Sequence, residues 1–435
     1  MSFTSPEGAQ EPGEPRWGDV YLSAAARGVS TCGDVLAATA LVLALQAGGA
    51  GGFTIAALLL AESVPLLLLA PVAGRLADRV DSRLLVVTAG LAQAVVCTAL
   101  AFTGQPVAVI ALVAVLSTGL AVTSPTLGAL VPDMVGLENM PRASAIGQTA
   151  TSLGMLAGPA LAGVLVGQFG VRVPLLIDAA TFLAIAAVGL VLRTRRGGKQ
   201  ATAQAAAGGA GPDAGPGWRL RGDVLLLTLV VAVSVSVAAV TAVNVADVFF
   251  VRVTLHASTT AYGLVTAVWT AAMLGGSWLA ARAIRKGSDG ALAVGLLGAL
   301  AVSATMLVIS AGVPSIWWLI PLWVIGGVLN GGENVMASVF VARRVPAPVR
   351  GRALGIFVGA VNGANVFGYL AGGLLLAVVT PRSVLALSGV AGLVIAVACL
   401  APVLRAARRE RAAAPVTPGA PGAEPALAGG YRPES

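Results

Sequence analysis

The chain has 435 residues, of which 57% are hydrophobic and only 11% charged, whereas an ordinary globular protein carries about 25% charged residues. With a mean hydropathy of +0.90, the chain has too little polar surface to cover a water-soluble body. This composition excludes a soluble enzyme, a disordered chain and a small secreted domain held by disulfides, and the formal net charge of +8 needs an explanation from its position in the chain.

Twelve apolar segments follow one another, each close to the length of about 20 residues that a membrane-spanning helix needs. Most of them lack a polar face, which argues against the buried helices of a soluble protein. The sequence therefore predicts an all-α membrane protein with twelve transmembrane helices. We expect these helices at 22–47, 53–74, 84–104, 107–127, 143–167, 173–192, 224–250, 261–282, 290–311, 315–342, 353–379 and 383–404.

The twelve segments divide into two groups of six. Residues 193–222 are rich in Ala, Gly and Arg, which predicts a flexible cytoplasmic linker between six-helix bundles at 22–192 and 223–404. We expect disordered cytoplasmic tails at 1–21 and 405–435. Parallel halves related by an axis along the membrane normal are a transporter architecture.

The basic residues predict the orientation in the membrane. If the N-terminus lies in the cytoplasm, the cytoplasmic loops carry 17 Lys and Arg residues, while the opposite loops carry only Arg172, Arg252 and Arg382. This asymmetry predicts that both termini are cytoplasmic and that the protein is a multi-pass protein of the cell membrane. The arginines would then face the anionic inner leaflet, so the positive charge needs no nucleic-acid partner.

The loop after the second segment carries a recognisable pattern, Gly74-Arg-Leu-Ala-Asp78-Arg79-Val-Asp-Ser-Arg83. Its spacing resembles the signature loop of the major facilitator superfamily, Gly-x-x-x-Asp-Arg-x-Gly-Arg-Arg, although Asp81 and Ser82 replace the later glycine and the next basic residue. An ordinary basic cytoplasmic loop is the alternative. The resemblance implies a latch that closes the cytoplasmic side, with partners at the start of the eleventh helix. Its expected members are Gly74, Asp78, Arg79, Arg83, Arg350 and Arg352.

The fifth segment reads Gly154-Met-Leu-Ala-Gly158-Pro159-Ala-Leu-Ala-Gly163. Small residues at this spacing let two helices approach closely, and Pro159 removes a backbone donor and bends its helix. A general packing stripe would explain the glycines alone. The added Gly-Pro pair resembles the antiporter motif of exporters in the same superfamily, which implies efflux.

Further stretches resemble the drug/proton-antiporter and siderophore-exporter branch, which includes macrolide efflux proteins and the enterobactin exporter. They are Ser30-Thr-Cys-Gly-Asp34, Val131-Pro-Asp133, Pro141-Arg-Ala143, Asp178-Ala-Ala-Thr-Phe182 and the stretch from Pro346 to Arg352. The resemblance covers residues 22–404 and implies the major facilitator fold. The fourth segment lacks the Arg-x-x-x-Gly pattern that other antiporter branches use for proton coupling.

Five acidic residues lie inside the apolar segments: Asp34, Glu62, Asp178, Asp247 and Glu333. A charged group costs about 2.5–3.5 kcal/mol at the centre of a membrane helix, so we expect these residues to face the protein interior. A carboxylate that loses its water favours its protonated form, which makes them candidate proton carriers. The alternative is that they only join helices through hydrogen bonds; Glu62 could also pair with Arg27.

In the superfamily fold, the first, fourth, seventh and tenth helices line a central cavity, which implies that Asp34, Asp247 and Glu333 face it. Asparagines at helical spacing extend the set, although they could equally serve only to hold the bundle together. The expected pathway for substrate and protons comprises Asp34, Glu62, Asn244, Asp247, Asn330, Glu333, Asn334, Asn362 and Asn365.

The remaining candidate residues predict no further chemistry. We interpret Trp269, Trp278, Trp317, Trp318 and Trp323 as anchors at the membrane interface rather than as ligand contacts. The single histidine, His256, lies in an outer loop. Without clustered ligands or a nucleotide-binding loop, we expect no metal, no cofactor and no direct use of ATP.

Together these patterns predict a secondary active transporter, not an enzyme. We expect a monomer that exports a bulky amphipathic small molecule, such as a drug, antibiotic or siderophore, by proton antiport through alternating access. Two alternatives stay open: an inward or facilitative solute permease of the same fold, and a non-transporting membrane receptor or scaffold. An intramembrane enzyme ranks last, because no metal set or nucleophile-base pair is visible.

Overall fold

The computed structural model describes residues 15–192, 194, 223–284, 289–345 and 349–413, and the regular elements in these ranges are helices. The predicted linker, apart from Thr194, and most of the predicted tails lie outside the described residues. The helices are α1 (Trp17–Ala47), α2 (Gly52–Arg79), α3 (Ser82–Ala101), α4 (Pro106–Phe169), α5 (Arg172–Val191), α7 (Val224–Phe249), the π-helix η2 (Phe250–Thr254), α8 (Thr259–Ala283), α9 (Asp289–Gly312), α10 (Ile316–Arg344), α11 (Arg350–Leu375) and α12 (Pro381–Ala413).

Helix α4 contains two membrane spans. The chain reverses at Gly136, whose φ of 72° lies in the left-handed region that glycine adopts without strain. The spans Pro106–Gly136 and Glu138–Phe169 bring the number of helices long and apolar enough to cross a membrane to 12 in the described residues. The predicted all-α architecture with twelve membrane helices is therefore confirmed. The expected loop at 128–142 is wrong, because it is helical on both sides of the single glycine.

Two predicted tail boundaries are also wrong. Helix α1 begins at Trp17, inside the expected tail 1–21, and its start is held in place: the Arg142 guanidinium lies 4.6 Å from the centre of the Trp17 ring. Helix α12 continues to Ala413, inside the expected tail 405–435. Residues 405–413 are almost all Ala and Arg, which have high helix propensity.

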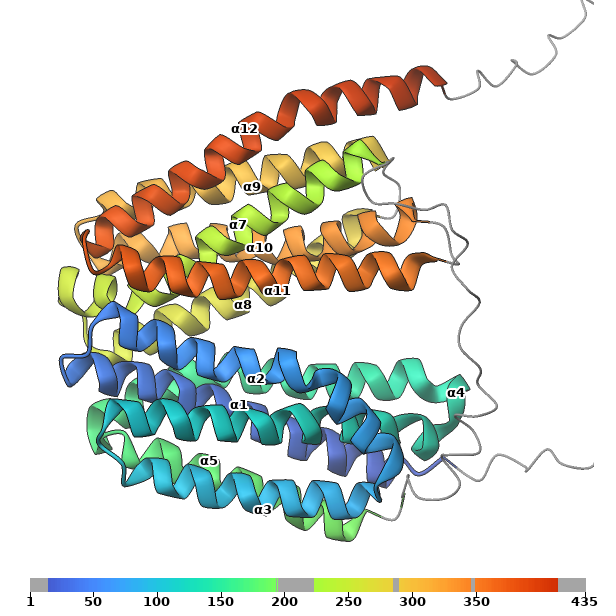
Figure 1. Ribbon diagram of the computed structural model, residues 1–435, viewed down its shortest axis with the longest axis vertical. Coiled ribbons are helices and arrows are strands. Elements are labelled where there is room, and N and C mark those ends of the chain that lie inside the picture. The colour runs from blue at the N-terminus through green and yellow to red at the C-terminus, as the bar shows by residue number, and fades with distance from the viewer. Residues whose placement is uncertain (1–14, 193, 195–222, 285–288, 346–348, 414–435) are drawn as a thin grey trace, which may run out of the picture.

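The helices form two groups along the chain, α1–α5 and α7–α12, which we call the N-terminal and C-terminal halves (Figure 1). The start of α1 and the end of α12 lie at the same end of the molecule, on the right in Figure 1. We call this the proximal end and the opposite end the distal end. The helices run back and forth between the two ends, as a chain that crosses a membrane repeatedly must.

The apolar cores show how the two halves meet. At the distal end one continuous core includes Ile55 of the N-terminal half and Val245 of the C-terminal half. At the proximal end the N-terminal half has its own core around Leu130, and the C-terminal half has another around Leu226. Among the described residues, the halves therefore share their core at the distal end.

Glycines allow the closest distal contacts between the halves. Gly163 of α4 lies against Gly263 of α8, so a Cβ added at Gly263 would lie 2.9 Å from the Gly163 Cα. Gly373 of α11 lies against α2, where an added Cβ would be 2.7 Å from the Cβ of Ala56. At both places backbone packs on the other half with no room for a side chain.

Candidate functional site

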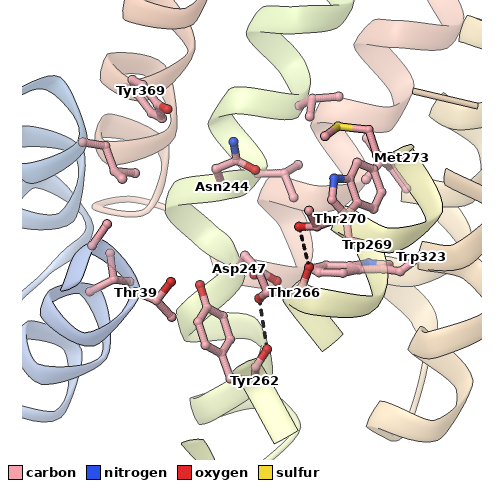
Figure 2. Close-up of a pocket in the computed structure, with 16 residues that line it drawn as sticks. Thr39, Asn244, Asp247, Tyr262, Thr266, Trp269, Thr270, Met273, Trp323 and Tyr369 are labelled. Carbon is pink, nitrogen blue, oxygen red and sulfur yellow. Dashed lines mark hydrogen bonds between the residues drawn. The ribbon is translucent and has the colours of Figure 1, made fainter. Parts of the chain in front are cut away.

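A cavity of about 320 Å³ lies between the two halves and is lined by helices of both. Four aromatic side chains, Tyr262, Trp269, Trp323 and Tyr369, contribute to its mainly apolar wall (Figure 2). This volume falls at the lower end of the range that holds a drug-sized ligand, and an apolar wall with a few polar groups is typical of such sites. The polar groups of the lining are Thr39, Asn244, Asp247, Thr266 and Thr270.

Asp247 is the acidic residue of this cavity. It lies on α7 with Asn244, and their spacing of three residues brings both to the cavity as the sequence predicts. Its side chain is 6% exposed and interacts with the side chain of Tyr262 on α8. Within the described residues, its Oδ1 atom has no hydrogen-bond partner. A buried carboxylate oxygen without a donor is poised to accept one from a ligand.

Trp269 and Trp323 are wall residues of the cavity, so their interpretation as interface anchors is wrong. Their rings meet edge to face, with centroids 5.6 Å apart and planes at 70°, a favourable aromatic geometry. Trp317 and Trp318, by contrast, are 77% and 65% exposed at the distal start of α10. The signal for Trp269 was available in the sequence, because it follows Tyr262 at a spacing that places both on one face of α8.

Asp34 lies within the N-terminal half instead of lining the central cavity. It borders a polar chamber of about 230 Å³ and a smaller cavity of about 30 Å³, and Glu62 of α2 lines the smaller one. Asp34 interacts electrostatically with Asp178 and Glu62. Three of the five predicted intramembrane acids are therefore grouped in one half of the protein.

Asp178 of α5 is fully buried against α3 and α1. The Cys97 thiol donates to its Oδ2 at 3.3 Å, and the Thr181 hydroxyl donates to its Oδ1 at 3.1 Å. Gly33 of α1 packs directly on this carboxyl group, and an added Cβ there would also lie 2.7 Å from the Thr181 hydroxyl oxygen. The Cys97 bond joins α5 to α3, and the packing of Gly33 brings α1 against the same carboxyl group.

Glu333 also lies inside a half and does not line the 320 Å³ cavity. The hydroxyl of Ser303 on α9 donates to its Oε1 at 2.7 Å, and only 7% of the residue is exposed. Asn330 lies beside it and lines a cavity of about 20 Å³. Asn334 donates from Nδ2 to the Asn330 carbonyl at 2.9 Å and is exposed.

The two asparagines of α11 have different surroundings. Asn365 accepts a hydrogen bond of 2.8 Å from the hydroxyl of Thr241, which joins α11 to α7. Asn362 is half-buried one turn earlier. Of the nine predicted pathway residues, the structure thus brings Asn244 and Asp247 to the central cavity and places the other seven elsewhere in the two halves.

The sequence profile of the major facilitator superfamily matches residues 24–312 and 229–429. The chain belongs to this superfamily. No curated protein matches the sequence.

Solved structures of superfamily transporters have the same fold. The nucleoside transporter NupG is 15% identical over 88% of this chain and 98% of its own, with a TM-score of 0.69. A bacterial homologue of the iron transporter ferroportin, in an inward-facing state, is 15% identical over 89% and 99%, with a TM-score of 0.68. A bacterial homologue of the human lysosomal transporter Spinster, inward-facing and unoccupied, is 14% identical over 90% and 97%, with a TM-score of 0.66.

The superfamily loop at 74–83 is described in part. Arg79 is exposed at the end of α2, and the Arg83 guanidinium donates to the carbonyl of Leu190 at the end of α5. Asp81, which departs from the superfamily pattern, caps α3 by accepting from the backbone N–H of Arg83 at 2.8 Å. The side chains of Gly74, Asp78, Arg350 and Arg352 lie outside the described residues.

The second span of α4, which carries the antiporter-like pattern, packs on both halves. Gly154 lies against the Gly28 carbonyl of α1, and a Cβ at Gly158 would lie 2.8 Å from the Cβ of Val35. Directly after Gly158, the Pro159 carbonyl lies against α8 of the other half, and so does Gly163 little more than one turn further on. The glycines therefore fix this span to α1 and to the distal contact between the halves.

In the part of the chain that the structure describes, no three His, Cys, Asp or Glu side chains are placed to hold a metal ion together. The central cavity offers aromatic rings for stacking, hydrogen-bonding groups, and a carboxylate, Asp247, that can gain or lose a proton or a cation.

Proposed function

We propose that this superfamily transporter exports a bulky amphipathic small molecule, such as a drug, antibiotic or siderophore, in exchange for protons. The observation that carries the proposal is the aromatic, acid-bearing cavity between two halves that share a core at one end. Rocking of the halves would open this cavity to each side of the membrane in turn. Resemblance of the span with Gly154, Gly158, Pro159 and Gly163 to the antiporter motif supports export.

The arginine distribution supports a cytoplasmic proximal end in the cell membrane. The distal contacts would then close the outer side, and the structure would be inward-facing, the state in which an exporter takes up its cargo. Two solved relatives of the same fold are inward-facing. On this view the segment 193–222 is the cytoplasmic linker between the bundles 22–192 and 223–404, and the loop at 74–83 latches the proximal end when it closes.

The cavity chemistry suggests how substrate and proton exchange. An apolar ring system would stack against Trp269 and Tyr262, while Asp247 would bind either a cationic group of the substrate or a proton. A buried carboxylate is destabilising unless its charge is compensated. If substrate and proton compensate it in turn, occupation by one favours release of the other, which is the requirement for antiport.

The test uses purified protein in liposomes and a fluorescent cationic amphipathic dye. A gradient of about one pH unit, acidic inside, should accumulate the dye about tenfold for one-to-one exchange, because one pH unit corresponds to about 1.4 kcal/mol. An ionophore that dissipates the gradient should remove the accumulation. The result does not depend on the direction in which the protein inserts.

The other hypotheses give different results in the same assay. A symporter would exclude the dye from acidic liposomes, a facilitative permease would equilibrate it regardless of the gradient, and a receptor or scaffold would give no flux. The variant Asp247→Asn keeps the shape of the side chain and should reduce the accumulation ratio from about ten to about one. Thr118→Val, on the exposed face of α4, is the control and should accumulate dye normally. Normal accumulation by Asp247→Asn would contradict the assignment of this acid.

A further inference from the structure

The chamber of about 230 Å³ inside the N-terminal half is a second cavity, which the proposed substrate site does not use. Arg27, Thr31 and Asp34 line it from one face of α1, at spacings of four and three residues. Thr123 of α4 and Gln93 of α3 complete its polar wall. Asp34 marks its inner limit near the middle of α1, and Arg27 lies two turns closer to the proximal end.

Gln93 indicates what fills the chamber. Its side chain is 2% exposed, yet within the described residues neither its Nε2 nor its Oε1 has a hydrogen-bond partner. The Gln93 side chain packs closely against Gly119 of α4, since a Cβ added at Gly119 would lie 2.6 Å from the Gln93 Cγ. A buried amide without partners is strongly unfavourable in a dry site.

Asp34, which lines the same chamber, also lacks a hydrogen bond, since its Oδ1 has no partner among the described residues. A buried water needs roughly 10–15 Å³ of such space and two to four polar partners. The chamber exceeds this volume many times over, and hydroxyls of Ser30, Thr31 and Thr123 add further partners. Water in the chamber would satisfy the amide and the carboxyl group together.

Several charged and titratable groups surround Asp34. From its own helix comes Arg27, from α2 Glu62, and from α5 Asp178, while Cys97 of α3 lies against Asp178. On α4 the chamber presents hydroxyls and apolar groups. Asp34 touches both the chamber and the small cavity that reaches Glu62. Tyr369, which interacts electrostatically with Glu62, lines the substrate cavity.

We propose that this chamber is a water-filled proton-access site for Asp34, separate from the cavity that takes the substrate. The inference rests on the proposed proton antiport and adds the route of the proton. In the conformation described here, the Asp34 O–H bond breaks, the carboxylate keeps the electron pair, and a chamber water becomes hydronium. The proton then leaves towards the proximal end. Uptake is the reverse step, in which hydronium returns to water.

Asp34 lies outside the substrate cavity, so its proton release must be coupled to the exchange at Asp247 through movement of the halves. Glu62 of α2 and Tyr369 of α11 belong to different halves, so the interaction between them changes when the halves rock. Loss of a proton in the chamber can therefore alter the distal contact without reaching the substrate.

A first experiment tests whether the chamber holds water. In a background whose three cysteines are replaced, Thr123→Cys should react with a hydrophilic, membrane-impermeant thiol reagent added to both sides. Thr126→Cys is the matched control, because Thr126 lies on the same helix, is 1% exposed against 6% for Thr123, and lines none of the described cavities. It should stay unreactive. Equal, negligible labelling of both positions would overturn the proposal.

A second experiment tests the use of the chamber. Gln93→Met has nearly the same shape but no amide, and it should slow dye-driven proton movement, recorded with a pH-sensitive dye trapped in liposomes. Exchange of labelled for unlabelled dye needs no proton release and should keep its wild-type rate, as should the dye Kd. Gln93→Asn retains an amide and should restore part of the proton movement. A purely structural defect would slow both the proton movement and the dye exchange and would raise the dye Kd.

The outcomes separate this inference from the proposed function. If wild-type protein transports dye without moving protons, proton antiport is wrong and the chamber has no such use. If wild-type protein moves protons and Gln93→Met does so at the same rate, the chamber is not the route, while proton antiport stands.

Discussion

The distal glycine contact gives a sharp test of how the two halves move. In Gly263→Ala the new Cβ would lie 2.9 Å from the Cα and N of Gly163 and would overlap the Pro159 carbonyl oxygen. All of these are backbone atoms, so no side-chain rotation can make room. Inserting a methyl group into such packing costs about 1–3 kcal/mol.

This cost falls on one conformation. The contact exists when the distal end is closed and is lost when the halves separate there. The gain in helix propensity from Gly to Ala, up to about 1 kcal/mol, applies to both conformations and cancels. A cost of about 1–3 kcal/mol therefore shifts the equilibrium towards the distally open state by about 5–150-fold.

Electron–electron distance measurements between spin labels detect the shift. Labels at Gln105 and Pro314, both exposed and distal on different halves, should show an increased population of longer distances in Gly263→Ala. Gly275→Ala on the same helix meets open space and should leave the distribution unchanged. Gly276→Ala presses on the Val328 backbone within one half, so it should lower thermal stability without opening the distal end. Identical distributions for Gly263→Ala and Gly275→Ala would refute the reasoning.

Two further predictions concern single interactions. Thr241→Val removes the hydrogen bond to Asn365 and should lower the free energy of unfolding by about 0.6–1.7 kcal/mol. Thr305→Val is the control and should change this free energy less, because the Thr305 hydroxyl bonds within its own helix. Thermal unfolding in detergent measures both variants. Trp269→Ala should weaken dye binding about tenfold, or ~1.4 kcal/mol, while the exposed Trp318→Ala should not. Equal dye affinity in the two variants would remove Trp269 from the binding site.

The sequence predicted the helices well because a membrane span must satisfy two independent conditions, sufficient length and almost no charge. It failed at the proximal turn of α4. There Asp133, Glu138 and Arg142 indicated a loop, yet these residues lie on helix, with the reversal at Gly136. At the end of a span, polar residues on a helix and polar residues in a loop look alike in the sequence.

The candidate acids were equally visible, since a charge in an apolar run is costly and therefore conspicuous. The sequence did not show which of these acids line the cavity and which lie inside the helix bundles. Glu333 and Asp247 both lie on helices expected to line the centre, but the rotation of α10 turns Glu333 towards Ser303 of α9. That rotation is set by packing between helices distant in the chain. The aromatic wall was missed because tryptophan in a membrane protein suits both an interface and a cavity.

The positions of the acids and of the distal contacts together suggest how a proton can control the gate. Tyr369 precedes Gly373 by one helical turn on α11, and Gly373 packs on α2 at Ala56. Glu62, which interacts with Tyr369, lies on the same α2 helix less than two turns from Ala56. The contact that closes the distal end and the acid that connects to Asp34 therefore share one helix pair. Because α2 is a stiff connection between them, a change of charge at Glu62 in the proposed antiport would act on the closure directly, without a long series of side-chain movements.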